Sequence, residues 1–159
     1  MHQTTAHKVA DYFINRSHRS GDPLSNLKLQ KLLYYAQAWY LAFHYSPLFV
    51  ERIEAWPHGP TVPPVYSTYK KWEWQPITVD RQEPQFAIAI KDHLADVMQQ
   101  YGRYNAFHLE LLTHQEKPWR DARKGLPPDA PSNAVITHEA MSDFYRSQLH
   151  GKKPKTARN

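Results

Sequence analysis

The sequence predicts a mainly α-helical protein, a compact single-domain bundle around one central buried helix, with a small β-hairpin or extended pair near residues 47–56. Two observations predict this class. Apolar residues recur at helical spacing in several segments that Gly and Pro separate. Strands do not alternate with helices along the chain. The 159 residues suit one domain, and a domain of this size buries roughly two thirds of the surface that its unfolded chain exposes.

The central helix is expected at residues 27–42. Ser25 or Asn26 can cap its N-terminus, and the run contains neither Gly nor Pro. Its apolar residues cover two adjoining faces, so other elements must surround it. These residues are Leu29, Leu32, Leu33, Tyr35, Ala36, Trp39 and Tyr40.

Further helices are expected on both sides of this one along the chain. A first helix at 5–17 follows a capping Thr4 or Thr5, and Gly21 and Pro23 then turn the chain. Residues 73–88 contain Pro76 and Pro84 amid polar residues and predict an irregular loop. The other helices are expected from 63, at 89–101, at 105–114, from 118 to 124, and after 137.

The β element is expected from two short segments, 47–50 and 53–56, with a polar step between them. Residues 57–60 (PHGP) then predict a rigid turn, because proline fixes φ and Gly59 can adopt positive φ. His58 sits on this turn. It can bond the nearby backbone, contact a partner, or take part in catalysis, and loops often carry function.

Composition excludes several classes. There is no cysteine, which rules out disulfides, thiolate metal sites and cysteine nucleophiles. No run of about 18 apolar residues is present, and the first residues lack the apolar core of a signal peptide. We therefore expect a cytoplasmic protein with no membrane contact.

The formal charge of +5 is concentrated at the C-terminus. Residues 152–158 hold four of the 20 basic residues and none of the 15 acids, which leaves 16 − 15 = +1 for residues 1–150. We expect a domain at 1–150 followed by a basic, disordered tail at 151–159. Contact of this tail with RNA or an acidic partner is the alternative, and nucleic-acid binding elsewhere is not expected.

Motifs for catalysis are missing from the chain. There is no glycine-rich phosphate loop, no Gly-x-Ser-x-Gly elbow and no His-Glu-x-x-His arrangement. Glu110 and His114 are one turn apart, which suits a helix-surface hydrogen bond better than a metal site. We predict no enzyme, no metal and no cofactor, with a hydrolase built from Glu110, His114, Glu116 and Asp121 as a rival reading.

Aromatic residues crowd into residues 56–74, beside Lys70 and Lys71. A satellite core under a loop is one interpretation. A protein-binding patch is the other, because Trp and Tyr dominate interface hot spots, while stacking of single-stranded bases suits the nearly neutral body less well. We predict partner contacts at Trp56, His58, Tyr66, Tyr69, Trp72 and Trp74.

The segment 112–123 (LTHQEKPWRDAR) predicts a structural clasp. Pro118 breaks the helix and Trp119 is expected to be buried. Carboxylates and arginines here can bridge neighbouring helices, since an arginine fork pairs with a carboxylate through two hydrogen bonds. The clasp residues are His114, Glu116, Trp119, Arg120 and Arg123.

Three ordered segments resemble the Panacea antitoxin domain, the family of SocA-like and phage-associated GepA-like proteins. They are 27–39 (LKLQKLLYYAQAW), 47–60 with PLF and IEAWPHGP followed by Val65-Tyr66, and 112–123. The resemblance covers about residues 5–148. This chain departs from the family pattern at Tyr45-Ser46, where a glycine is frequent, and at Pro63-Pro64, where an acid is frequent.

The resemblance implies a function that composition does not. Family members act as antitoxins of bacterial and phage toxin–antitoxin pairs and neutralise toxins by direct binding. Some resemble adaptors that deliver the toxin to a protease. A cognate toxin encoded nearby is therefore the expected partner, with a proteolytic adaptor or a nucleic-acid-binding regulator as the alternative roles.

Overall fold

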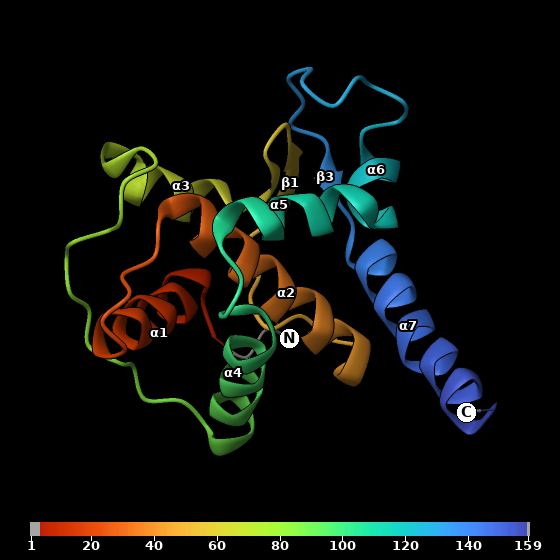
Figure 1. Cartoon of the computed structure of the whole chain (residues 1–159), viewed down its shortest axis with the longest axis horizontal. Coiled ribbons are helices and arrows are strands. Elements are labelled where there is room, and N and C mark those ends of the chain that lie inside the picture. The colour runs from red at the N-terminus through yellow and green to blue at the C-terminus, as the bar shows by residue number, and fades with distance from the viewer. Residues whose placement is uncertain (1–3, 159) are drawn as a thin grey trace.

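The computed structural model describes residues 4–158, with side chains described for residues 4–149. Helices pack around α2, and a small sheet lies at one end of the molecule (Figure 1). The fold class expected from the sequence is confirmed. The elements are α1 (Ala6–Arg19), α2 (Asn26–His44), β1 (Ile53–Trp56), β2 (Gly59–Thr61), α3 (Pro63–Tyr69), the 3-10 helix η1 (Lys70–Trp72), α4 (Ile88–Tyr101), α5 (Ala106–Gln115), α6 (Lys117–Ala122), β3 (Val135–Ile136) and α7 (His138–Arg158).

The central helix is α2, as the sequence predicts. Ser25 caps it, and the Ser25 hydroxyl accepts a hydrogen bond from the Lys28 amide at 3.2 Å. Helices α1, α4, α5 and α7 all contact α2, which runs through the middle of the molecule (Figure 1). Because neighbours surround it, apolar residues on both of its adjoining faces are buried.

The sheet is antiparallel with strand order β2-β1-β3, and β1 and β2 form a hairpin. Residues 47–50, which were expected to be extended beside 53–56, are not a strand. The buried amide of Gln37 explains this: it donates to the Phe49 carbonyl and accepts from the Leu48 amide, both at 2.7 Å. Since a side chain of α2 occupies these backbone groups, β1 pairs with residues 59–61 instead.

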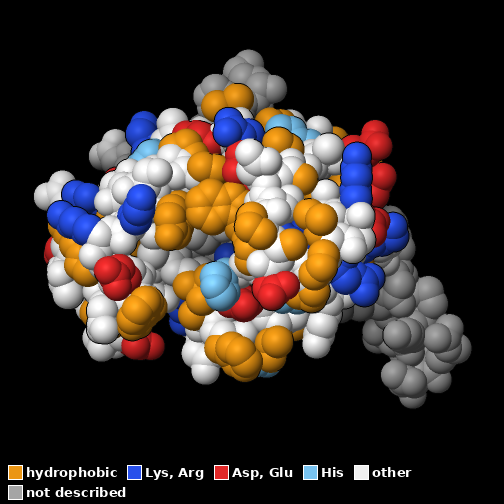
Figure 2. Space-filling model, turned by 90° about the horizontal axis from the view of Figure 1, so that it is seen from above, with side chains coloured by type: hydrophobic (Ala, Val, Ile, Leu, Met, Phe, Trp, Pro, Cys, Tyr) orange, Lys and Arg blue, Asp and Glu red, His pale blue; other side chains and the backbone are white. Residues whose placement is uncertain are grey.

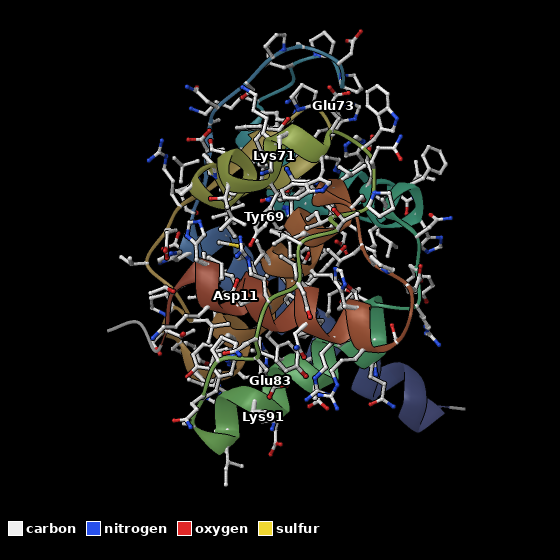
Figure 3. The ribbon with its side chains drawn as sticks, turned by 90° about the vertical axis from the view of Figure 1, so that its left-hand side faces the viewer. Asp11, Tyr69, Lys71, Glu73, Glu83 and Lys91 are labelled. Carbon is white, nitrogen blue, oxygen red and sulfur yellow. The ribbon has the colours of Figure 1, made fainter. Side chains whose placement is uncertain are left out.

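The irregular segment between η1 and α4 runs across α1 (Figure 3). Polar contacts hold it there. Glu83 pairs with Arg16 at 3.1 Å and with Lys91 at 3.2 Å, and the Arg81 carbonyl accepts a hydrogen bond from Asn15 at 2.9 Å. The segment therefore reaches α4 without forming regular structure of its own, as its prolines predict.

Helix α7 packs along α2 and begins after Thr137, whose hydroxyl accepts from the Ala140 amide at 3.0 Å. Met141 and Tyr145 are buried on its inner side. The helix continues to Arg158, but side chains beyond residue 149 lie outside the described part, so the basic tail stays a prediction. Within the described residues, no helix combines the length and apolar character needed to cross a membrane.

Candidate partner-binding site

An open groove of about 500 Å³ lies where the N-terminal end of α2, the β1–β2 hairpin and the η1 region meet. We call it the aromatic groove. Four of the six predicted contact residues line it, namely Trp56, His58, Tyr66 and Trp74. On this side of the molecule, hydrophobic side chains gather around a hollow bordered by a histidine and acidic groups (Figure 2). The fold thus brings together residues that are up to 18 positions apart in the chain.

Trp56 forms one wall of the groove at the end of β1. Its indole N–H donates to Glu54 at 2.8 Å, and its ring meets that of Tyr66 edge to face, with centroids 4.9 Å apart. Its carbonyl accepts a hydrogen bond from the indole of Trp119 at 2.7 Å. The side chain of Trp56 is half-buried, and Trp119 holds its backbone through this hydrogen bond. The wall is therefore preorganised for binding.

His58 stands at the tip of the hairpin turn, with 78% of its side chain exposed. Its Nδ1 lies 3.2 Å from Oε2 of Glu110 on α5. The next residue has φ of +106°, and a Cβ at Gly59 would lie only 2.7 Å from Cε of Lys31. Both the positive φ and the lack of space for a Cβ therefore require glycine at position 59. This glycine fixes the turn that presents His58.

Trp74 forms the opposite rim and is 76% exposed. It follows Glu73, whose φ of 55° and ψ of −122° are typical of the first central position of a type II′ turn. The Gln75 amide closes this turn on the Trp72 carbonyl at 2.9 Å. Glycine is the usual residue there, so Glu73 adopts a strained conformation that projects Trp74 outward.

Tyr69 and Trp72 do not line the groove. Tyr69 is 1% exposed, belongs to the core, and accepts a hydrogen bond from Arg81 at 3.1 Å. It lies inside, whereas Lys71 and Glu73 are near the outer end of the same region (Figure 3). Trp72 packs on the core and donates to Thr78 at 3.0 Å. The prediction of Tyr69 as a contact residue is wrong for this fold, because its helical phase turns it inward.

The floor of the groove is polar and comes from α2. Gln30 accepts from the Val62 amide at 2.8 Å and donates to Asn26 at 2.9 Å. Lys31 is fully buried beneath Gly59 and donates to the Pro60 carbonyl at 2.8 Å. Burial lowers the pKa of Lys31 to about 7, an effect that Glu110 partly offsets. The side chains of α2 thus hold the hairpin that carries Trp56 and His58.

Behind the groove, Glu116 joins three helices. Its Oε1 accepts hydrogen bonds from the hydroxyls of Tyr35 at 2.7 Å and Tyr145 at 2.8 Å, and Tyr145 is also 3.0 Å from the hydroxyl of Tyr34. Burial raises the pKa of Glu116, and the two hydrogen bonds act against that rise. The carboxylate thus connects the α5–α6 junction to α2 and α7.

The other clasp residues divide into two groups. His114 stacks on Trp119, with centroids 3.9 Å apart, and burial lowers the pKa of its ring. Arg123 is buried, lies over the Trp119 ring, and donates to carbonyls rather than to a carboxylate. Arg120 is exposed, and no ion pair or side-chain hydrogen bond involves it within the described residues. The expected pairing of these arginines with carboxylates is therefore wrong, because main-chain carbonyls from the sheet and the 127–130 loop surround Arg123.

The four residues of the hydrolase hypothesis each contact a different partner. Glu110 meets His58, His114 stacks on Trp119, Glu116 accepts from tyrosines, and Asp121 pairs with Lys117 on an exposed turn. No group of three or more potential metal ligands occurs in the part of the chain that the structure describes. The arrangement does not bring these groups together as a reaction centre.

Comparison with known proteins identifies the family. The model of the antitoxin SocA-like Panacea domain matches residues 29–120. This chain belongs to the SocA-like Panacea family. Antitoxin SocA of Caulobacter vibrioides (strain NA1000 / CB15N) is 39% identical to it over 64 residues, which are 40% of this chain and 34% of that protein. The aligned part therefore spans about a third of this curated relative. No solved structure matches the chain.

The Panacea match includes the four predicted contact residues that line the aromatic groove and most of the clasp. It runs from early in α2 to the middle of α6. Helices α1 and α7, and the buried Arg123, lie outside it. The matched segment thus contains most of the residues that line the groove, and helices α1 and α7 add to the core around α2.

The sequence patterns missed two kinds of residue at this site. The sequence pattern indicates that Gln30 and Lys31 face solvent as polar residues of a helix. In the structure they are buried and form the floor of the aromatic groove. Phe107 and Leu111 are 67% and 44% exposed and belong to α5, the helix whose Glu110 contacts His58. The sequence did contain a signal for Phe107 and Leu111. Apolar residues occur all around α5, whereas only the face that contains Leu109 is buried.

Replacing Glu116 by alanine is expected to lower the free energy of unfolding by about 2–3 kcal/mol, because it leaves buried tyrosine hydroxyls without their acceptor. Glu116→Gln is the matched control: its amide oxygen can still accept both hydrogen bonds, so the loss should stay below about 1 kcal/mol. Urea unfolding monitored by tryptophan fluorescence measures both variants. Equal losses would contradict the acceptor role of Glu116.

Proposed function

We propose that this protein is the antitoxin of a toxin–antitoxin pair and neutralises its cognate toxin by binding it through the aromatic groove. Membership of the SocA-like Panacea family supports the antitoxin role. The observation that carries the mode of action is the groove itself, where Trp56, His58, Tyr66 and Trp74 meet on one open face. Direct binding, rather than catalysis, is what this set of side chains suits.

The energetics favour a protein partner. Large exposed apolar side chains in one region are typical of interaction sites. Trp74 on the rim is exposed, and α5, which contacts His58 through Glu110, carries the exposed Phe107 and Leu111. Burying such side chains contributes about 25 cal/mol per Å² of apolar area, and tryptophan and tyrosine are the usual anchors of an interface.

Growth rescue tests the proposed function. The open reading frame adjacent to this gene is expressed from an inducible promoter, alone and together with this protein. We expect growth arrest in the first case and normal growth in the second, with the two proteins recovered as one complex by affinity purification. Arrest that this protein does not relieve would contradict an antitoxin role, and rescue with a loss of the toxin rather than a complex would favour the adaptor role.

Trp74→Ala is expected to weaken the complex at least about 30-fold, which corresponds to a hot-spot loss of about 2 kcal/mol. The side chain is exposed, so its removal leaves folding nearly unchanged. Isothermal titration calorimetry with the purified neighbouring protein measures the dissociation constant. Tyr66→Ala and His58→Ala test the other side of the groove in the same assay.

The matched control is Phe43→Ala. Phe43 is an exposed aromatic residue, with 51% of its surface accessible, but it lies at the other end of α2. Phe43 is 16 positions after Leu27, which corresponds to about 24 Å along the helix. This variant should bind like the wild type. If Phe43→Ala weakens binding while Trp74→Ala does not, the site lies elsewhere.

A further inference from the structure

The floor of the aromatic groove contains one basic side chain, Lys31. Lys31 is fully buried there, and an ammonium group has three N–H donors. Among the described residues, only the Pro60 carbonyl accepts a hydrogen bond from it. The neighbouring amides are already used, because Gln30 bonds Val62 and Asn26. A buried charge is screened little by solvent, so it acts strongly on whatever occupies the groove.

The rim adds to this charge. Lys70 and Lys71 line the groove, and Glu73 is the one acidic residue among the lining side chains. The N-terminal end of α2, where a helix carries partial positive charge, supplies Asn26 and Leu27 to the same wall. The groove therefore combines apolar aromatic walls with a floor and a rim that attract negative charge.

Resting on the function proposed above, we propose that the aromatic groove binds an acidic segment of the partner protein, with a carboxylate held over Lys31 and apolar side chains against Trp56 and Trp74. Charge complementarity selects this occupant. A purely apolar segment would add no partner to the single hydrogen bond of Lys31, and a basic segment would be repelled by Lys70 and Lys71.

The binding of such a segment is coupled to a proton. Burial lowers the pKa of Lys31 to about 7, so the free protein holds this site only partly protonated at pH 7.5. A carboxylate in the groove favours the charged ammonium and raises its pKa again. The other titratable groups around Lys31 are Glu110 and His114 on α5, His58 on the turn, and the rim residues Lys70, Lys71 and Glu73.

Short peptides test the inference without knowledge of the toxin. We would titrate the full-length protein with a capped hexapeptide of alternating glutamate and leucine, and with its counterpart of alternating glutamine and leucine. The expected result is at least tenfold tighter binding of the glutamate peptide. In calorimetry at pH 7.5, in buffers of different ionisation enthalpy, its binding should take up about half a proton or more.

Three variants assign the effect. Lys31→Met should remove both the preference for glutamate and the proton uptake. The double variant Lys70→Gln with Lys71→Gln, on the exposed rim, should weaken the preference without touching the core. Lys91→Gln is the matched control. Lys91 lies on α4 and pairs with Glu83, and neither residue lines the groove, so this variant should leave peptide binding unchanged.

Several results would overturn the inference. They are equal affinity for the two peptides, no binding at millimolar peptide concentration, or a Lys31→Met variant that keeps the glutamate preference. Tighter binding of a single-stranded oligonucleotide at physiological salt would replace the acidic segment by a nucleic acid. Rescue of growth by this protein together with any of these results would leave the proposed function standing and this inference refuted.

Discussion

Replacing Arg123 by alanine is expected to lower the free energy of unfolding by about 3–5 kcal/mol. Arg123 donates to the carbonyls of Ala55 at 2.9 Å, Pro127 at 2.8 Å and Ala130 at 2.6 Å. It therefore connects β1 to the loop that leads to β3. Its loss removes the donor to the carbonyl of the buried Ala55, frees the 127–130 loop from β1, and removes the cation that lies over Trp119. Urea unfolding, with far-ultraviolet circular dichroism as the signal, measures the change.

Arg120→Ala is the matched control for this prediction. The two arginines are three residues apart, but Arg120 is exposed and Arg123 is 2% exposed. A surface substitution of this kind changes stability by about 0.5 kcal/mol or less. Arg123→Lys should also be costly, because an ammonium cannot reproduce the arginine fork that reaches several carbonyls at once. Similar stabilities for Arg120→Ala and Arg123→Ala would refute the role given to Arg123.

A rise in stability between pH 7 and about pH 9.5 is the second large effect that we expect. The pKa of Lys31 is about 7 in the folded protein and takes the ordinary value of 10.5 when the chain unfolds. Between these values the unfolded chain holds a proton that the folded protein has lost, so raising the pH favours the folded state. The slope approaches about 1.4 kcal/mol per pH unit, which amounts to about 3 kcal/mol over this window.

Lys28 contributes in the same direction, because burial also lowers its pKa, and the remaining groups set the limits of the window. Burial lowers the pKa values of His93 and His114, so their contributions change at or below pH 6.5. Burial raises the pKa of Tyr34, Tyr35 and Tyr145, so the unfolded chain ionises first and stability falls above about pH 10. Lys31→Met should flatten the rise between these limits. Chemical unfolding at a series of pH values checks this, and an unchanged slope in the variant would contradict a neutralised Lys31.

The candidate site could be predicted only in part from the sequence. The cluster at residues 56–74 was visible as a concentration of aromatic residues, and four of the six expected contact residues do line one groove. Composition could not separate Tyr69, which is 1% exposed, from Trp74, which is 76% exposed. Tyr69 is buried by its phase on α3, whereas Trp74 is exposed by a turn at Glu73 that places a non-glycine residue at positive φ, against the usual preference.

The polar residues of α2 show the same limit. Gln30, Lys31 and Gln37 are buried, although a polar residue in a helix normally faces solvent. Each holds backbone that is distant in the chain: Gln30 holds Val62, Lys31 holds Pro60, and Gln37 holds the Leu48–Phe49 segment. Such hydrogen bonds leave no periodic trace in the sequence, which is why residues 47–50 were expected to be extended and are not a strand.

The sequence by itself determined the helical class, the central position of α2 and a cap at Ser25 or Asn26, of which the structure shows Ser25. These depend on local periodicity and on short-range hydrogen bonds, both of which are written in consecutive residues. Only the tertiary structure decided which aromatic residues face the groove, which lysine forms its floor, and which of two neighbouring arginines is buried. Those outcomes depend on which groups cover each face, and these groups are distant in the chain: Tyr35 contacts Glu116, 81 residues away, and Tyr34 contacts Tyr145, 111 residues away.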